Sequence, residues 1–321
     1  MKINNATRQK KTFRERGKNF IRLFLRDWQL HLMVLIPAIY ILIFSYGPMY
    51  GVQIAFRNFR PRGGITGSEW VGLKWFVEFL NDFNFTKTFV NTIVLSLYNI
   101  ATFPLPIIFA LILNALRAQR YKKVVQTITY MPHFVSMTVM VSILMMILSP
   151  VSGLYGTFYQ LFGGMGYPAD FRGLAATFRH LYVWSGVWQE LGWSSIIYTA
   201  ALSAVSMELH EAAMIDGASR FKRILCVDFP TIAPSVGIML IMRLGSIVSV
   251  GFEKAFLLQS NLNGDVSEVI ATYVYKKGMS SIRYYSYGSA VSLFNTMINL
   301  TMLIIVNAIS KKITDDEVSI F

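Results

Sequence analysis

Apolar residues gather in six long stretches that charged segments separate, at residues 30–50, 88–115, 130–149, 180–204, 232–252 and 286–308. About 20 mainly apolar residues form a helix that crosses the ~30 Å hydrocarbon core of a bilayer. One such stretch also suits a core helix of a soluble protein, but six in one chain favour membrane spans. The pattern therefore predicts an all-α integral membrane protein with about six transmembrane helices.

The composition agrees with a membrane-embedded bundle. Hydrophobic residues make up 54% of the chain and charged residues 15%, whereas about 25% of an average soluble domain is charged. Cys226 is the only cysteine, so the chain contains no internal disulfide. The first apolar stretch begins too far from Met1 for an ordinary cleaved signal peptide, and we expect it to be a retained helix.

Positive charge is unevenly distributed. The formal net charge is +13, and residues 1–30 contain nine Lys or Arg against Glu15 and Asp27. A second basic cluster follows the second stretch and consists of Arg117, Arg120, Lys122 and Lys123. Cytoplasmic loops are rich in Lys and Arg, so both clusters are predicted to be cytoplasmic, and an even number of spans places Lys311 and Lys312 there too. No nucleic-acid recognition motif is present, and no nucleic-acid partner is expected.

This topology places residues 205–231 inside the cell and three segments outside it, at 51–87, 150–179 and 253–285. The first outer segment carries the aromatic residues Trp70, Trp75, Phe76 and Phe79. Such rings suit an interfacial helix at headgroup depth. They equally suit a loop that packs on the ends of the spans, and the sequence leaves both readings open.

The inner segment has the pattern of a helix–turn–helix. Glu211, Ala212 and Ala213 favour a helix, and Gly217 can adopt the left-handed conformation that ends it. Ser219 can then cap a second short helix. Pro230 is predicted to end that helix and to lead into the fifth span.

The same residues resemble a known signature. The pattern E-A-A-x3-G-x9-I-x-L-P is typical of permease subunits of binding-protein-dependent ABC importers. The chain departs from it at Val227 and Phe229, which both stay apolar. In that family the segment is a coupling helix, and the resemblance implies that it docks on an ATPase through Glu211, Ala212, Ala213, Asp216, Gly217, Ala218 and Pro230.

Other segments resemble the same family. Asn91-Thr92 looks like the start of its core domain, and Tyr130-Met131-Pro132 also fits. The basic N-terminus and Ala271-Thr272-Tyr273-Val274-Tyr275 are most similar to the polysaccharide-uptake branch of the maltose-permease-like superfamily. The implied organisation is a basic cytoplasmic segment, a first span with its outer segment, a core of five spans and a cytoplasmic tail, at residues 1–29, 30–87, 88–308 and 309–321.

The resemblance implies partners and a mechanism. A second homologous permease would complete the pathway, two ATPase subunits would dock on the inner face, and an external solute-binding protein would deliver an oligosaccharide. ATP and Mg would bind to the ATPases, and no cofactor is expected on this chain. ATP-driven closure of the ATPases would push the coupling helix and switch the bundle between inward-open and outward-open states. The expected location is the bacterial cytoplasmic (inner) membrane, with both termini cytoplasmic.

Enzyme motifs are missing from the sequence. It contains no G-x-x-x-x-G-K-[ST] phosphate loop and no G-x-S-x-G nucleophile motif. His31, His133, His180 and His210 show no metal-ligand spacing with Cys or carboxylates. We therefore expect no catalytic residue and no metal site in this transport subunit.

Ionisable residues inside spans usually face a cavity or a partner. Glu190 and Arg243 are predicted to face the bundle interior, where they would bind substrate or form a structural ion pair. The neighbouring rings would either line a sugar path or form an interfacial belt, although Trp188 and Trp193 do not share one helical face. The candidates for the substrate path are Trp188, Gln189, Glu190, Trp193, Arg243, Asn99, Ser292, Asn295 and Asn299.

Two further spans carry polar features. Ser292, Asn295 and Asn299 recur on one face of the sixth span, where they would line the path or hydrogen-bond another helix. Asn99, Pro104 and Pro106 predict a bend in the second span whose freed carbonyls need a partner. Gly245 and Gly251 are predicted to permit close packing in the fifth.

Other functions remain as alternatives. An ABC permease for a small non-sugar solute fits the same signature. A stand-alone secondary transporter would need coupling-ion ligands or an inverted repeat, and a membrane enzyme would need a nucleophile and a base. We find none of these features in the sequence.

Overall fold

The computed structural model describes residues 26–116, 118–280 and 284–313. Within these ranges the chain is helical apart from one β-hairpin, which confirms the predicted all-α class. The chain divides into two compact units, Met1–Gln53 and Ile54–Phe321. Most of the basic segment 1–29, Arg117 and most of the tail 309–321 lie outside the described residues.

The predicted count of six spans is not confirmed. Four described helices are long and apolar enough to cross a membrane, and a bent pair makes a fifth, at Trp28–Phe56, Phe85–Ala115, Arg220–Gly245, Tyr285–Lys312 and Gln119–Phe134 with Met137–Ile147. Helix α10 (Ala175–Leu202) has 28 residues and is long enough. It is too polar to count among these candidate spans, because it includes Arg179, Gln189 and Glu190.

The first long helix begins with α2 (Trp28–Ile41) and continues through a π turn (Leu42–Tyr46), α3 (Gly47–Met49) and a 3-10 segment (Tyr50–Phe56). No side chain of α2 is buried within the described structure. An apolar helix with every face exposed is suited to lipid or to another subunit.

The outer aromatic segment folds as a hairpin and a short helix. Strands β1 (Arg57–Arg60) and β2 (Gly64–Trp70) pair antiparallel around a 3-10 turn (Pro61–Gly63). Helix α4 (Lys74–Leu80) follows and buries two aromatic side chains.

Those aromatic side chains hold the segment on its neighbours. Trp75 donates its indole N–H to the carbonyl of Arg57 at 2.9 Å. Phe79 is 1% exposed and meets Phe294 edge-on, with ring centroids 5.7 Å apart. Trp75 and Phe79 thus pack on neighbouring elements, whereas Trp70 remains 60% exposed, and the interfacial reading stays a prediction.

The second predicted span is one long helix, Phe85–Ala115, with a short interruption beside its prolines. Helix α5 (Phe85–Ala101) ends just before α6 (Pro104–Ala115) begins, with Pro104 in the first turn of α6. A proline lacks the N–H of an internal helical residue. At the interruption the carbonyl of Asn99 accepts hydrogen bonds from the Thr102 backbone and side chain at 3.2 and 2.7 Å.

The third predicted span, 130–149, is not one straight helix. Helix α7 (Gln119–Tyr130) continues into a 3-10 turn (Met131–Phe134), and α8 (Met137–Ile147) leaves at 105° to it. Ser136 caps α8 by accepting the N–H of Val139. A capping residue has extended rather than helical backbone angles, so the chain turns there.

The remaining chain contains short helices around long ones. Helix α9 (Leu154–Leu161) precedes α10, and α11 (Met207–Ile215), α12 (Arg220–Arg223) and α13 (Phe229–Gly245) follow it. Then come α14 (Phe252–Leu258), α15 (Gly264–Ser267), α16 (Ile270–Ser280) and α17 (Tyr285–Ile313).

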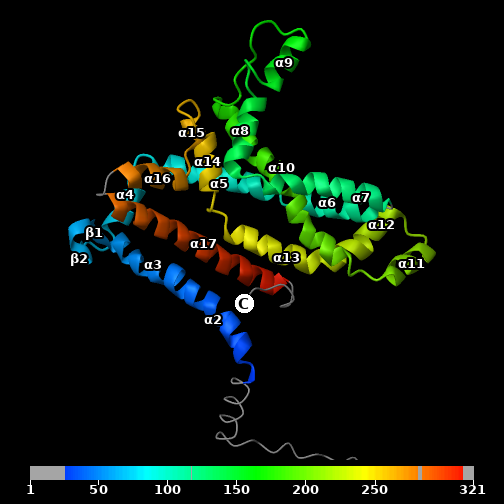
Figure 1. The fold of residues 1–321 in the computed structure, drawn as a ribbon, viewed down its shortest axis with the longest axis horizontal. Coiled ribbons are helices and arrows are strands. Elements are labelled where there is room, and N and C mark those ends of the chain that lie inside the picture. Colours follow the sequence, from blue (N-terminus) through cyan, green and yellow to red (C-terminus); the bar gives the residue numbers. More distant parts are fainter. Residues whose placement is uncertain (1–25, 117, 281–283, 314–321) are drawn as a thin grey trace, which may run out of the picture. The chain divides into compact units, whose positions relative to one another are not determined.

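Two helices organise the packing of the second unit. Helix α10 contacts α6, α7 and α13, and α17 contacts α13, α16 and α4. Helices α13 and α17 run side by side (Figure 1). Gly245 permits this approach, because a Cβ there would lie 2.5 Å from the Leu303 side chain. The packing role predicted for Gly245 is confirmed.

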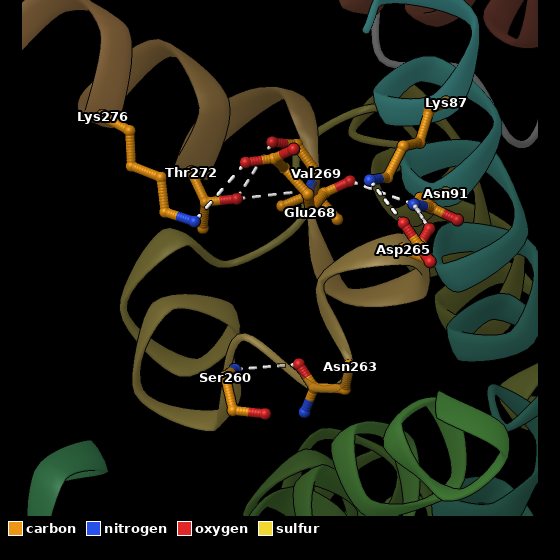
Figure 2. A network of polar contacts seen from close by, with 9 residues as sticks. All are labelled: Lys87, Asn91, Ser260, Asn263, Asp265, Glu268, Val269, Thr272 and Lys276. Atoms are coloured by element: carbon orange, nitrogen blue, oxygen red, sulfur yellow. Dashed lines mark hydrogen bonds and ion pairs between the residues drawn. The ribbon is translucent and has the colours of Figure 1, made fainter. Parts of the chain in front are cut away.

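A polar network fixes α15 and α16 on the start of α5 (Figure 2). The Asn91 amide donates to the carbonyls of Asp265 and Glu268, at 2.8 and 3.2 Å. Lys87 forms an ion pair with Asp265 at 2.8 Å. The Thr92 hydroxyl accepts the N–H of Ile270 at 3.0 Å. The Asn91-Thr92 pair therefore satisfies backbone groups of a segment about 175 residues away.

A second polar cluster lies between α4 and α16. Asp82 accepts hydrogen bonds from Tyr273 at 2.6 Å and from Lys277. Burial alone would raise the pKa of the Asp82 carboxyl, but hydrogen bonds from Lys277, Tyr273 and the Asn84 backbone outweigh it and lower the pKa to about 2. The carboxylate therefore stays charged, and because it also accepts from Tyr287 of α17 at 3.2 Å, it connects the end of α4 to α16 and α17.

Candidate functional site

The helix–turn–helix predicted at residues 205–231 is present, with one correction. Ser206 caps α11, Gly217 adopts a left-handed backbone with φ +75°, and Ser219 caps α12. The Ala218 N–H closes the turn on the Ala213 carbonyl at 2.9 Å. These features match the expected helix end and second cap.

The correction concerns Pro230, which does not end the second helix. Residues Arg220–Gly245 form one continuous helix, and a π turn (Ile224–Asp228) joins α12 to α13. Pro230 lies in the first turn of α13. The wider π turn removes the need for the N–H that proline lacks, so the helix passes through this position.

The tip of this element exposes apolar side chains that the motif did not single out. Ile215 is 87% exposed and Phe221 is 71% exposed. They flank the turn at Gly217, and no side chain of α11 is buried within the described structure. Large apolar groups gathered on a protruding surface mark an interaction site. Their position beside the glycine turn was the sequence signal for them.

A buried carboxylate anchors the element to the bundle. Asp228 is 4% exposed. Its Oδ1 atom lies 3.2 Å from the His210 Nε2 atom of α11 and accepts a hydrogen bond from the Asn114 amide of α6 at 3.2 Å. Asp228 thus connects α11, α6 and the π turn below α13. This contact joins residues far apart in the chain, and no sequence pattern indicates it.

A cavity of about 440 Å³ lies among α5, α6, α8, α10, α13 and α14. It brings together five of the predicted path residues, namely Asn99, Gln189, Glu190, Trp193 and Arg243. Trp188 instead lines a separate apolar pocket with Trp184, in agreement with the prediction that Trp188 and Trp193 do not share a face.

Glu190 and Arg243 line the same cavity but do not form an ion pair. The Glu190 carboxylate lies 3.0 Å from His133 Nδ1, and the His133 ring stacks on Trp193 with centroids 4.2 Å apart. Gln189 is buried and donates to the Val135 carbonyl at 2.9 Å, which satisfies the backbone at the bend between α7 and α8. These contacts position one wall of the cavity.

Arg243 of α13 contacts the backbone at the interruption between α5 and α6. Its guanidinium donates to the Asn99 carbonyl at 3.4 Å. This carbonyl therefore accepts from a charged side chain of α13 in addition to the Thr102 backbone and side chain. Arg243 itself remains exposed in the cavity.

The polar stripe of the sixth span contacts protein and does not line this cavity. Asn299 accepts the Val248 N–H at 3.0 Å and donates to the Ser249 hydroxyl at 2.8 Å. Asn295 donates to the Val248 carbonyl at 3.5 Å, whereas Ser292 is exposed. The asparagines satisfy the irregular backbone after α13, which ends at Gly245 and not at residue 252 as predicted.

That early end brings an unpredicted residue to the cavity. After Gly245 the chain returns to pack α14 on α8 and α10, and Lys254 lines the cavity with Arg243 and Glu190. The predicted topology places Lys254 in the outer segment 253–285. Only its position beside the apolar run 255–258 indicated a buried environment.

A bundle of long apolar helices with a protruding helix–turn–helix and a polar internal cavity defines a multi-pass membrane permease. Residues 102–315 match the family of binding-protein-dependent transport system inner membrane components, and the chain belongs to that family. It is therefore a transport permease subunit of an ABC importer.

Two curated relatives come from Bacillus subtilis (strain 168). The polygalacturonan/rhamnogalacturonan transport system permease protein YteP is 38% identical over 94% of each chain. Protein LplB is 37% identical over 92% of this chain and 93% of its own length. Both alignments include the first span and its outer segment, which precede the family match.

Solved structures agree with the fold. One is a bacterial alginate ABC transporter in complex with an alginate pentasaccharide-bound periplasmic protein, with a TM-score of 0.81, 34% identity and coverage of 91% of this chain and 97% of that one. Another is a bacterial ABC transporter involved in import of the acidic polysaccharide alginate, with a TM-score of 0.82 and 34% identity. The match covers 92% of this chain and 99% of that one.

Proposed function

We propose that this subunit forms, with a second homologous permease, the membrane pathway through which an ABC importer takes up acidic oligosaccharides. Two ATPase subunits supply the energy and hold ATP and Mg, while this chain carries no catalytic step. A solute-binding protein delivers cargo on the external face. The observation that carries the proposal is the near full-length similarity to a polygalacturonan permease and to alginate transporters.

The energy enters through the element 207–230. Its exposed Ile215 and Phe221 offer an apolar tip for a groove on an ATPase, and Ala212 and Ala213 keep the adjacent surface low. Glu211 and Asp216 are exposed beside them. In this arrangement the element faces the cytoplasm, as do both termini, which agrees with the basic residues at the N-terminus and on α7.

Cargo passes the cavity that Glu190, Trp193 and Arg243 line. Ligand sites combine apolar or aromatic walls with a few placed polar groups, and this cavity has Trp193, Phe103 and Tyr198 beside its charged groups. A 440 Å³ cavity in one subunit suits a sugar unit or two, with the second permease completing the path. A small non-sugar solute is the alternative cargo.

Reconstitution tests the proposal. The chain is co-expressed with the second permease, the ATPases and the binding protein of its source organism, and uptake of labelled trigalacturonate into proteoliposomes is measured with and without ATP. We expect ATP-dependent uptake. Glu211→Gln and Gly217→Pro should abolish uptake and retention of the ATPases, while Glu253→Gln, on α14, should retain the ATPases. ATP-independent uptake by the chain alone, or full activity of Gly217→Pro, would contradict the proposal.

A further inference from the structure

Lys254 occupies an unusual position for a charged residue. It is 5% exposed, yet it lines the cavity between α10 and α13. Its Nζ atom lies 4.8 Å from the centroid of the Tyr182 ring. Removing an ammonium group from water is costly unless hydrogen bonds or an opposite charge compensate, so a buried lysine keeps its charge only beside an anionic partner.

No residue in the described part of the chain supplies a dedicated anion to Lys254. Among the described residues, no carboxylate lies within ion-pair distance of Nζ. Glu190 acts on it only at longer range, because the Glu190 carboxylate is engaged with His133 at 3.0 Å. The adjacent Glu253 accepts a hydrogen bond from Thr138 at 3.2 Å instead. The charged groups lining the cavity are Lys254, Arg243 and Glu190, so positive charge is in excess there.

The helix opposite Lys254 leaves room for the ammonium group. A Cβ at Gly186 of α10 would lie 2.9 Å from Nζ, closer than real Cβ contacts. Any larger residue at this position would force the ammonium group to shift. Glycine in mid-helix costs about 1 kcal/mol relative to alanine, and here the missing side chain gives the lysine its place on the cavity wall.

We infer that Lys254 is a carboxylate-binding residue of the translocation path, which selects uronate-containing sugars at this cavity. The inference rests on the proposed import function and names a residue that its general form does not include. A cargo carboxylate would provide the anion that the described residues do not place beside Lys254. A charge-assisted hydrogen bond between an ammonium group and a carboxylate is among the stronger polar contacts. Arg243 lies on the same wall to receive a second carboxylate or a hydroxyl group.

The test compares two cargoes of equal length in the fully assembled transporter. Uptake of trigalacturonate, which is acidic, is measured beside uptake of its methyl ester, which is neutral. The same solute-binding protein serves every variant, so a change in the acid-to-ester ratio belongs to the permease. Lys254→Met should lower acid uptake about tenfold while ester uptake stays within about twofold of the unmodified protein, as expected for loss of one charged contact.

Two further variants separate binding from folding. Gly186→Ala keeps the charge and favours the helix, so it should assemble normally and still lower the acid-to-ester ratio several-fold. Lys74→Met removes an exposed lysine that also lies over an aromatic ring, 5.1 Å from the Trp75 centroid, and should change neither uptake. Equal loss of both cargoes in Lys254→Met, or an unchanged ratio in both cavity variants, overturns the assignment. If the unmodified complex takes up neither cargo, the proposed function itself fails.

Discussion

His210 Nε2 lies 3.2 Å from the buried Oδ1 atom of Asp228, which links α11 to the π turn at the base of α13. The same oxygen accepts from Asn114, so α6 shares the contact. No side chain of α11 is buried in the described part of the chain. The contact between His210 and Asp228 therefore connects this helix to the interior of the helix bundle. Movement of α11 should therefore reach α6 and α13 together.

Breaking this link should loosen α11 without unfolding the bundle. We expect Asp228→Ala to leave Asn114 without its acceptor, which costs about 1–3 kcal/mol for a buried polar group, and to raise hydrogen–deuterium exchange across residues 207–215. Glu208→Gln changes an exposed residue of the same helix and should leave exchange as it was. Equal protection of α11 in Asp228→Ala and the unmodified protein would refute the role of the contact.

The apolar tip should be needed for subunit association and not for folding. Ile215→Ser with Phe221→Ser removes two exposed side chains, so thermal unfolding in detergent should shift little, while co-purification of ATPase subunits should fall at least about tenfold, since buried apolar anchors dominate interfaces. Phe162→Ser is a matched control, because Phe162 is 85% exposed after α9 and away from the tip. Retained ATPases in the double variant would rule out docking there.

Asp82 should make stability depend on pH. Its pKa is lower in the folded protein, about 2, than the ordinary value of 3.8. Its stabilisation is therefore complete above pH 4 and is lost as the pH falls toward 2. At pH 7 we expect Asp82→Asn to lower the free energy of unfolding by on the order of 1–2 kcal/mol, and the difference from the unmodified protein should shrink between pH 4 and pH 2.

A control for that measurement is Asp265, whose side chain is 93% exposed in its pair with Lys87. An exposed ion pair contributes little, so Asp265→Asn should change stability far less at every pH. If both variants unfolded alike, or if the Asp82→Asn difference did not narrow in acid, the buried cluster would not be the source of the effect.

Asn299 should be more important for stability than its exposed neighbours on α17. Asn299→Leu leaves the Val248 N–H and the Ser249 hydroxyl without a partner in an apolar setting, and we expect a loss of about 1–3 kcal/mol. Thr296→Val removes a hydroxyl that bonds only within its own helix and should be nearly neutral. Thermal unfolding of the detergent-solubilised protein measures both, and similar melting temperatures for the two variants would contradict this reading.

Local sequence rules predicted the features that depend on local chemistry. Ser219 caps a helix, Gly217 takes the left-handed conformation, and the second span is interrupted beside its prolines, as hydrogen-bonding and steric rules require. Pro230 was misread because the pattern cannot show that a π turn absorbs the missing N–H.

Features that depend on distant contacts could not be predicted. From the sequence, Lys254 is predicted to lie in a polar outer segment. No pattern in residues 246–258 indicates that the chain turns back after Gly245 and packs α14 on α8 and α10. The 105° turn after Phe134 is stabilised by Gln189, 54 residues along the chain from Val135. The sequence motif therefore predicted the ATPase-docking element, whereas tertiary packing determines which residues line the cavity.

The uninterrupted helix Arg220–Gly245 has a mechanical consequence. Its 26 residues make a rod about 39 Å long at 1.5 Å per residue, so a tilt of about 5° about one end carries the other end roughly 3 Å. Phe221 lies near one end of this rod and Arg243 near the other. A subunit that rocks the first would reposition the guanidinium on the cavity wall by ångströms, and the chain between them need not refold.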